Sequence, residues 1–474
     1  MLFHTQEFAI LLAVLLLLFS VTTRWMTLLV MIAASYTFYG WAKPVYAFLL
    51  FGITVFNYFV AVVAEKTRVE TTRRRITMAV SVAVNFGALG YFKYGDFAVE
   101  NVHAVLQTMG LAHGAFESLH IYLPIGVSFF IFQSFAYSMD VILGRIDPCK
   151  NFLLYVLFVS WFPQLVAGPI ERPQTLIPEL LRLDEKRKGM ALRVPKAVSM
   201  YCEGYLRKMC ADVLAPVSES FFANPAPATT SEAIIGIVAF GLQIYGDFSG
   251  YTRMAQGVSW LFGVRLMENF DRPYLARDFK DFWRRWHISL STWFRDYVYI
   301  PLGGNRNGPV RAGVNMMGTM LISGLWHGAG WTFVFWGFLH GLYLLINNHT
   351  GFFWKRAPAI VSIPLVWVFV FLAWTPFRAT SFTNMLEAYQ ALGHGGFSAP
   401  SMAFMFGALG LVFCDVFHVR FQSGVVVAHR FFDKGLKADH IAATALWIAV
   451  CVTAGAIQWA VWGAEKQPFI YFQF

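Results

Sequence analysis

One histidine stands in an apolar, tryptophan-rich run where a polar side chain is costly. Residues 323–341 read SGLWHGAGWTFVFWGFLHG and place His327 next to Trp326 and among several glycines. Burial disfavours a charged imidazolium, so we expect a neutral ring with one nitrogen able to accept a proton. Such a ring in a dry cavity can act as a general base or a nucleophile. The alternative is a core histidine bonded to a carbonyl, and for His340 we expect a structural role or a place near the interface.

A second histidine lies in a segment of alternating basic and aromatic residues, 268–304. The apolar positions recur at i, i+3, i+4 and i+7; they are Trp283, Trp286, His287, Leu290, Trp293, Phe294 and Tyr297. This spacing predicts an amphipathic helix at the cytoplasmic interface, with His287 on its apolar side. Charged residues fall mostly on the other side: Arg284, Arg285, Arg295 and Asp296. The alternative is an aromatic belt that contains an incidental histidine.

A carboxylate interrupts a third apolar segment, LQIYGDFSGYTRMAQG, at residues 242–257. An ionised Asp247 inside a membrane costs about 2.5–3.5 kcal/mol by insertion scales unless it is paired. Tyr251 and Arg253 are the nearby candidates to satisfy it. A structural ion pair is at least as good an interpretation as a catalytic carboxylate, and we do not assign Asp247 as the base.

Other reactive motifs are absent from the sequence. There is no nucleotide-binding loop, no HExxH metal motif and no GxSxG elbow, so phosphate or metal chemistry is not indicated. The five cysteines form no CxxC pair, and no metal site or disulfide is expected from them.

The composition indicates the elements that must position these residues. Of 474 residues, 57% are hydrophobic and 14% are charged, against roughly 25% charged in soluble domains. Apolar runs recur along the whole chain, which predicts one polytopic membrane bundle. The net charge is +10, but the basic residues lie in short loops between these runs, a pattern of membrane topology and not of nucleic-acid binding.

Loop charge sets the expected topology. The first predicted spans cover 7–22, 25–41, 44–64, 76–94 and 121–143. The loop 65–75 carries five basic residues and is predicted to be cytoplasmic, whereas 95–120 has no Lys or Arg and is predicted to lie outside. The first basic residue, Arg24, follows the first apolar run, so we expect a retained first span with the N-terminus outside the cytoplasm.

The run 151–173 does not fit a single crossing. It begins near Arg145 and Lys150 and ends in 171–196, which holds seven basic residues, so both ends are predicted to be cytoplasmic. Helix breakers within it favour a re-entrant hairpin; they are Pro163, Gly168 and Pro169. Broken backbone at that depth requires protein or a water-filled cavity around it, so a cavity is expected here.

The rest of the chain follows the same logic. Residues 265–311 hold nine basic and five acidic residues, which predicts a cytoplasmic segment, an even number of crossings in 197–264 and a hairpin or re-entrant pair in 312–348. The remaining apolar runs are 358–376, 401–418 and 440–462. We expect about 10–12 crossings or part-crossings, and we find no internal repeat, which counts against a secondary transporter.

Four stretches together resemble the membrane-bound O-acyltransferase superfamily, in its bacterial polysaccharide branch of alginate O-acetylase-like proteins. They are QLVAGPIERP (164–173), YGDFSGYTRMAQGVSWLFG (245–263), DFWRRWHISLSTWFRDYVYIPLGGNR (281–306) and SGLWHGAGWTFVFWGFLHG (323–341). The resemblance implies a ring of helices around a thin central partition with a funnel on each face, formed by one domain over 1–474. Its N-terminal spans would cover 1–145, its catalytic core about 151–348 and its C-terminal spans 358–474.

The resemblance also implies roles for residues. His327 is expected to be catalytic and His287 to be the second signature histidine. Residues expected to contact donor or substrate are Trp326, Trp286, Arg284, Arg285, Arg295, Asp247 and Tyr251. The implied donor is acetyl-CoA from the cytoplasm, with no permanently bound cofactor. The implied partners are an exported SGNH-type acyltransferase or acceptor protein and a polysaccharide such as alginate, cellulose or peptidoglycan, in the bacterial inner membrane.

Other functions stay open at this point. Related enzymes transfer D-alanine to teichoic acid, which would change the acyl group. A proton-coupled transporter would use an intramembrane His and Asp as a relay. A purely structural subunit would tolerate replacement of both histidines.

Overall fold

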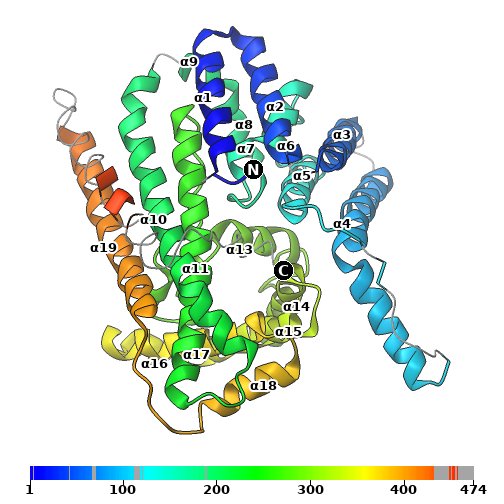
Figure 1. The fold of residues 1–474 in the computed structure, drawn as a ribbon. Helices are drawn as coiled ribbons and strands as arrows, with labels where there is room; N and C mark the ends of the chain where they lie inside the picture. Colours follow the sequence, from blue (N-terminus) through cyan, green and yellow to red (C-terminus); the bar gives the residue numbers. More distant parts are fainter. Residues whose placement is uncertain are drawn as a thin grey trace. The chain divides into compact units, whose positions relative to one another are not determined.

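The computed structural model describes residues 1–474 except 4, 42, 67–70, 112–117, 120, 187–188, 432–447, 450, 454–455 and 457–474, and for 24 and 417–431 it describes the backbone only. Where the chain is described, it forms helices and connecting loops without strands (Figure 1). It divides into two compact units. Unit 1 comprises residues 1–190, 262–266 and 328–330, and unit 2 comprises the rest. The predicted last run, 440–462, lies largely outside the described residues.

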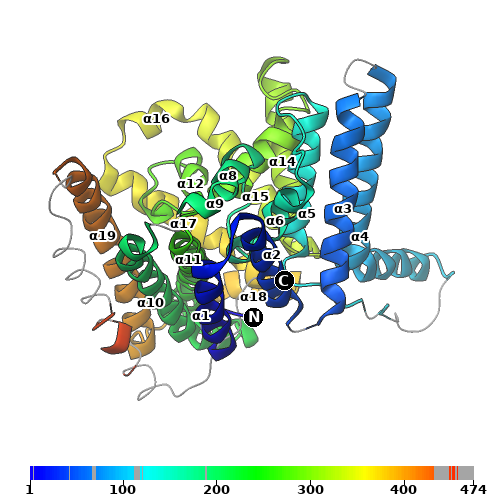
Figure 2. The same cartoon turned by 90° about the horizontal axis from the view of Figure 1, so that it is seen from above.

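Unit 1 is built from nine helices among its described residues. They are α1 (Gln6–Val21), α2 (Arg24–Gly40), α3 (Val45–Lys66), α4 (Thr71–Thr108), α5 (Val127–Ile142), α6 (Phe152–Ser160), α7 (Phe162–Leu165), α8 (Pro173–Leu181) and α9 (Leu183–Lys186). Figures 1 and 2 both show α3 and α4 as neighbours. Buried amides join them: Asn57 and Asn85 donate to each other's side-chain oxygens at 2.9 and 3.0 Å. Ser138 of α5 donates to Asn57 at 2.9 Å, so a hydrogen bond also connects α5 to α3.

Two predicted spans differ from the structure. The span predicted at 76–94 continues as α4 to Thr108, because the loop charge that we used reports the side of the membrane and not where a helix ends. The span predicted from 121 begins only at Val127. Pro124 and Gly126 precede it, and Gly126 has a φ of 74°, outside the right-handed helical region.

The predicted helix break in 151–173 is confirmed. Helix α6 stops at Ser160, α7 is a single turn, and residues 166–172 are not helical before α8 begins. Trp161 has a ψ of 104°, which ends the helix one residue before the pair Phe162–Pro163. The segment is buried from Leu154 to Ile170, so protein surrounds the irregular backbone, as such backbone requires at membrane depth.

Unit 2 contains all the candidate site residues. Its described helices are α10 (Met190–Ala223), α11 (Thr230–Leu261), η2 (Pro273–Leu275), α12 (Phe279–Arg285), α13 (Ile288–Phe294), the π-helix η3 (Arg295–Tyr299), α14 (Gly308–His327), α15 (Trp331–His349), α16 (Gly351–Arg356), α17 (Ala359–Arg378), α18 (Phe382–Ala391) and α19 (Met402–Phe431). An aromatic core built around Trp286, Trp336 and Trp374 joins α12, α15 and α17.

Glycines allow α14 and α15 to pack closely, and Figures 1 and 2 both show the two helices as neighbours. A Cβ at Gly324 would overlap the carbonyl oxygen of Phe333 and lie 3.1 Å from Cα of Gly337. A Cβ at Gly341 would lie 2.6 Å from Sδ of Met317. Small residues at such positions let helix backbones approach in membranes, and here they fix the end of α14, where His327 lies.

Four described helices are long and apolar enough to cross a membrane: α3, α4, α11 and α17. Shorter apolar helices cover 6–21, 25–40, 127–142 and 402–416. These elements agree with a multi-pass protein, and the total of 10–12 crossings stays a prediction.

Candidate active site

His327 is the last residue of α14 and is buried in an aromatic cage. Its ring centroid lies 4.9 Å from Trp326, 4.9 Å from Trp336 and 5.2 Å from Phe377, with each ring steeply inclined to the imidazole. Helix α14 is continuous from Arg311 to His327. The carbonyl dipoles at a helix C-terminus favour a positive charge, by up to ~2 kcal/mol in partly buried sites. This position therefore supports a ring that can take up a proton despite its burial.

His287 lies between two short helices and not within one, so the predicted continuous amphipathic helix from Trp283 to Tyr297 is wrong. Helix α12 ends at Arg285, His287 has φ 43° and ψ 55°, and α13 begins at Ile288. A side chain in this left-handed region costs on the order of 1–3 kcal/mol unless its surroundings hold it there. The helical spacing correctly predicted that His287 is on the buried side of the segment, but it did not reveal the turn.

Asn269 supplies the contacts that hold this turn. Its Oδ1 lies 3.1 Å from Nδ1 of His287 and accepts hydrogen bonds from the backbone N–H and the hydroxyl of Ser289, at 3.1 and 2.9 Å. Its backbone oxygen accepts from the N–H of Ile288 at 2.9 Å. Asn269 and His287 are both fully buried, and burial lowers the pKa of His287 to about 3.

The two histidines contact the same indole. The ring centroid of Trp326 lies 4.9 Å from that of His327 and 6.2 Å from that of His287. The structure thus brings together three residues that the sequence singled out from segments forty residues apart. Their roles in catalysis stay a prediction.

His340 belongs to the same aromatic layer but faces other neighbours. It is buried, its ring stacks on Phe282 at 6.0 Å and 10°, and it contacts Trp336 at 4.7 Å. Trp286, the other predicted tryptophan, packs on Phe282 and Trp374 at 5.6 and 4.9 Å. Both residues therefore contribute to the wall behind the histidines.

The three predicted arginines differ in exposure. Arg284 and Arg295 are exposed, and Arg295 pairs with the adjacent Asp296 at 2.8 Å. Arg285 is half-buried and pairs with Asp281 at 3.0 Å and Asp271 at 3.6 Å. Arg284 and Arg295 are thus more accessible to a phosphate than Arg285.

Asp247 has an ion-pair partner that we did not predict. Lys208 of α10 lies 3.0 Å from its carboxylate and also pairs with Asp212 at 2.5 Å. Arg253, which we considered for Asp247, instead pairs with Glu203 at 2.9 Å. Asp247 and Tyr251 are both buried in α11. The ion pair with Lys208 supports the structural interpretation of Asp247.

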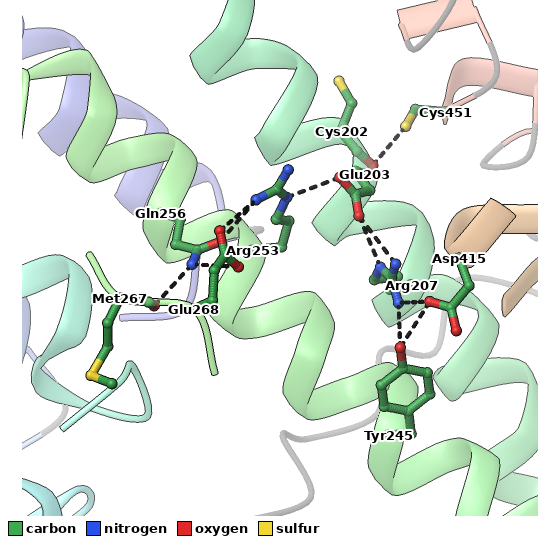
Figure 3. Close-up of polar contacts among 10 residues, drawn as sticks. All are labelled: Cys202, Glu203, Arg207, Tyr245, Arg253, Gln256, Met267, Glu268, Asp415 and Cys451. Atoms are coloured by element: carbon green, nitrogen blue, oxygen red, sulfur yellow. Dashed lines mark hydrogen bonds and ion pairs between the residues drawn. The ribbon is translucent and has the colours of Figure 1, made fainter. Parts of the chain in front are cut away.

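A buried network of charges continues from there through unit 2. Figure 3 shows Glu203 between two guanidinium groups, those of Arg253 and Arg207. Arg207 pairs with Glu203 at 3.1 Å and with Asp415 of α19 at 2.8 Å, and Tyr245 donates to Asp415 at 2.8 Å. The network therefore joins α10, α11 and α19 by charge-assisted bonds, each stronger than a neutral one.

Two cavities adjoin this network. The smaller is about 30 Å³, enough for a water molecule, and is lined by side chains that include Ser249 and Thr252. The larger is about 860 Å³ and is lined mainly by apolar residues of α11, α17 and α19. The lining of the larger cavity includes neither His287 nor His327, so it is separate from the histidine cage.

Sequence reasoning missed Asn269, Lys208, Glu203 and Arg207. The pair Glu203 and Arg207 had a usable signal, because opposite charges at i, i+4 in an apolar helix indicate a buried ion pair. Asn269 had none: its partners lie eighteen to twenty positions away and meet it only through the turn at His287.

Comparison with known proteins decides the family. The model of the membrane-bound O-acyltransferase family matches residues 143–386. The chain is 39% identical over 369 residues to a probable alginate O-acetylase AlgI of Azotobacter vinelandii, covering 77% of this chain and 72% of the relative. The chain belongs to the membrane-bound O-acyltransferase family. This membership confirms the predicted class, an all-α multi-pass membrane protein with O-acyltransferase activity.

Two further relatives extend the comparison. A probable alginate O-acetylase AlgI of Pseudomonas aeruginosa is 38% identical over 369 residues, 77% of this chain and 69% of the relative. A peptidoglycan O-acetyltransferase of Helicobacter pylori is 34% identical over 392 residues, 76% of this chain and 73% of the relative. The matched region of the family includes both His287 and His327.

Proposed function

We propose that this acyltransferase moves an acetyl group from cytoplasmic acetyl-CoA across the bacterial inner membrane to an exported acceptor, for O-acetylation of a cell-surface or secreted polysaccharide. The relatives described above bear the names of O-acetylases acting on alginate and peptidoglycan, which supports acetyl over D-alanyl transfer. A separate exported protein, an SGNH-type acyltransferase or an acceptor, then places the group on the polymer.

The observation that carries the proposal is the pair of buried histidines that both contact Trp326. His327 acts on the acceptor: it takes the proton from the attacking hydroxyl, or it carries the acetyl group transiently. Its position at the end of α14 favours the cation that forms in the first case. The aromatic faces around it add a cation–π contribution of about 0.5–2 kcal/mol.

His287 assists proton transfer and orients the acyl donor. Exposed arginines attract the donor to the site. Arg284 and Arg295 attract the phosphates of the donor from the cytoplasmic side. Trp326 and Trp286 exclude water from the reaction, which strengthens each electrostatic interaction with the developing charge.

Purified protein in liposomes tests this proposal. Labelled acetyl-CoA is supplied with an exported acceptor, and release of CoA and labelling of the acceptor are measured for the wild type and for His327→Ala. The proposal predicts acceptor-dependent turnover that His327→Ala loses while folding normally. Full turnover by His327→Ala would reject the assignment, and solute flux without an acyl donor would favour the transporter.

A further inference from the structure

We infer that Asn269 is a positioning residue that holds His287 as its Nδ1–H tautomer, so that Nε2 is the nitrogen that exchanges protons during acyl transfer. The inference rests on the proposed function for the use of His287, but the tautomer itself follows from hydrogen-bond chemistry alone. Asn269 lies outside the two stretches that carry the histidines, 281–306 and 323–341, and becomes part of the proton-transfer machinery.

The atom of Asn269 that faces the histidine is its amide oxygen. Oxygen and nitrogen of an amide are assigned from their partners. The atom in question lies 3.1 Å from the backbone N–H of Ser289, which can only donate. That atom is therefore the oxygen, Oδ1, and it can only accept.

The neutral imidazole of His287 carries its proton on Nδ1. The same Oδ1 lies 3.1 Å from Nδ1 of His287. Two acceptors do not form a hydrogen bond, so Nδ1 carries the proton. In the neutral ring the other nitrogen, Nε2, then holds the lone pair.

Backbone hydrogen bonds hold Asn269 and His287 in this arrangement. The backbone of Asn269 accepts from the N–H of Ile288, and the N–H of Asp271 donates to the oxygen of Arg285, both at 2.9 Å. Two backbone hydrogen bonds thus hold the loop segment around Asn269 against the turn at His287. The left-handed φ of 43° at His287 is part of this arrangement. Rotation of the amide would place its NH2 group against the backbone N–H of Ser289 and lose that hydrogen bond.

A defined tautomer restricts what His287 can do. A neutral ring with the lone pair on Nε2 accepts a proton there and does not donate one to a thioester carbonyl. During transfer the acceptor hydroxyl loses its proton as its oxygen bonds to the thioester carbon, and the C–S bond breaks to leave a thiolate. A proton that passes through His287 enters at Nε2, gives an imidazolium, and leaves from Nε2 to the thiolate, so the ring returns to its starting tautomer.

Replacement of Asn269 by aspartate separates this role from simple support of the turn. The carboxylate still accepts from Nδ1–H and from Ser289, but its negative charge favours the imidazolium. The pKa of His287 therefore rises from its depressed value toward the assay range. Because a protonated Nε2 cannot accept a proton, turnover should fall as the pH is lowered.

Asn347 offers a matched control in the same unit. It is also a buried asparagine whose Oδ1 accepts backbone N–H groups, those of Phe279 at 2.8 Å and Lys280 at 3.4 Å, at the start of α12. Asn347→Asp introduces the same buried charge without the bond to His287. Any loss that it causes reflects packing and should not depend on pH in this way.

The experiment measures donor turnover in liposomes from about pH 9 to about pH 6, across the range in which a histidine of ordinary or raised pKa titrates. Asn269→Ala should lose on the order of a hundredfold at every pH, the lower end of a general acid–base contribution. At the high end of the pH range, Asn269→Asp should recover most of the turnover that Asn269→Ala loses. At the low end of the pH range, its turnover should be about tenfold or more below that of the wild type. The turnover of Asn347→Asp, divided by that of the wild type, should stay constant across this pH range.

A pH profile of Asn269→Asp that runs parallel to wild type would overturn the inference, as would full activity of Asn269→Ala. Failure of the proposed function is visible separately, as a wild type without turnover or an active His327→Ala. If the Asn269 variants do not fold, the tautomer of His287 can still be measured in the wild-type protein.

Nitrogen NMR of histidine-labelled protein reports which ring nitrogen carries the proton. The spectrum of His287→Gln, subtracted from that of the wild type, assigns the signal of His287 among the twelve histidines. We expect a protonated Nδ1 and an unprotonated Nε2, and the reverse assignment refutes the inference.

Discussion

Replacing Gly324 by alanine should impair acyl transfer without unfolding the protein. Gly324 lies one turn before His327 in α14 and packs against α15. A Cβ there would overlap the carbonyl oxygen of Phe333 and approach Cα of Gly337 to 3.1 Å. Both obstacles are backbone atoms, so no flexible side chain can move aside to accommodate the methyl group.

The expected size follows from the geometry. Non-bonded heavy atoms in contact sit about 3.5 Å apart, so the two helices must separate by on the order of 1 Å near the histidine. A displacement of about 1 Å at a reacting group can cost ~100-fold in rate. Overpacking costs about 1–3 kcal/mol in stability, and the higher helix propensity of alanine offsets about 1 kcal/mol of this.

Gly318→Ala is the matched control, because Gly318 lies in the same helix and a Cβ there meets nothing within 4 Å. Donor turnover and melting temperature are measured for both variants in liposomes. We expect Gly324→Ala to lose turnover far more than stability and Gly318→Ala to retain both. Equal turnover of the two variants would refute the claim that close packing of α14 and α15 positions His327.

Three further predictions concern residues outside the cage. Glu203→Gln leaves two buried arginines short of a carboxylate and should lower the free energy of unfolding by about 3–5 kcal/mol; Glu268→Gln, whose side chain is 51% exposed, should change the melting temperature little, and similar effects of the two would contradict this account. His340→Phe should keep most of the turnover, because it preserves the stacked, buried surface, and complete inactivation of a folded variant would place His340 in the chemistry. Arg295→Gln should raise KM for acetyl-CoA, more at low salt than at high salt, and leave kcat unchanged, since an exposed charge acts by attraction; a salt-independent effect would exclude steering.

Much of the fold was accessible from the sequence because membrane helices obey strong local rules. Apolar length located α1, α2 and α3 to within a few residues. The conflict in loop charge between 145 and 196 pointed to a break, and the structure has one between α6 and α8. Charge did not reveal that α4 extends to Thr108, because positive residues report sidedness and say nothing about where a helix ends.

The site was less accessible because its decisive contacts are not local. His327 stood out because a polar group in an apolar membrane run is expensive, and His287 stood out because it falls on the apolar side of an aromatic segment. The turn at His287 depends on Asn269, and the ion pair of Asp247 depends on Lys208 of another helix. Neither partner is set by spacing along one helix, so periodicity could identify the buried residues but not which of them touch.

Sidedness of transfer tests the central claim most directly. Oriented liposomes receive acetyl-CoA, labelled in its acetyl group, on the cytoplasmic face only and an exported acceptor on the other face only. Our account predicts labelled acceptor in one compartment with the released CoA kept in the other, and no labelled acceptor with His327→Ala. Label that reaches the acceptor only when donor and acceptor share a compartment, or that reaches it equally well without His327, would contradict histidine-centred transfer across the membrane.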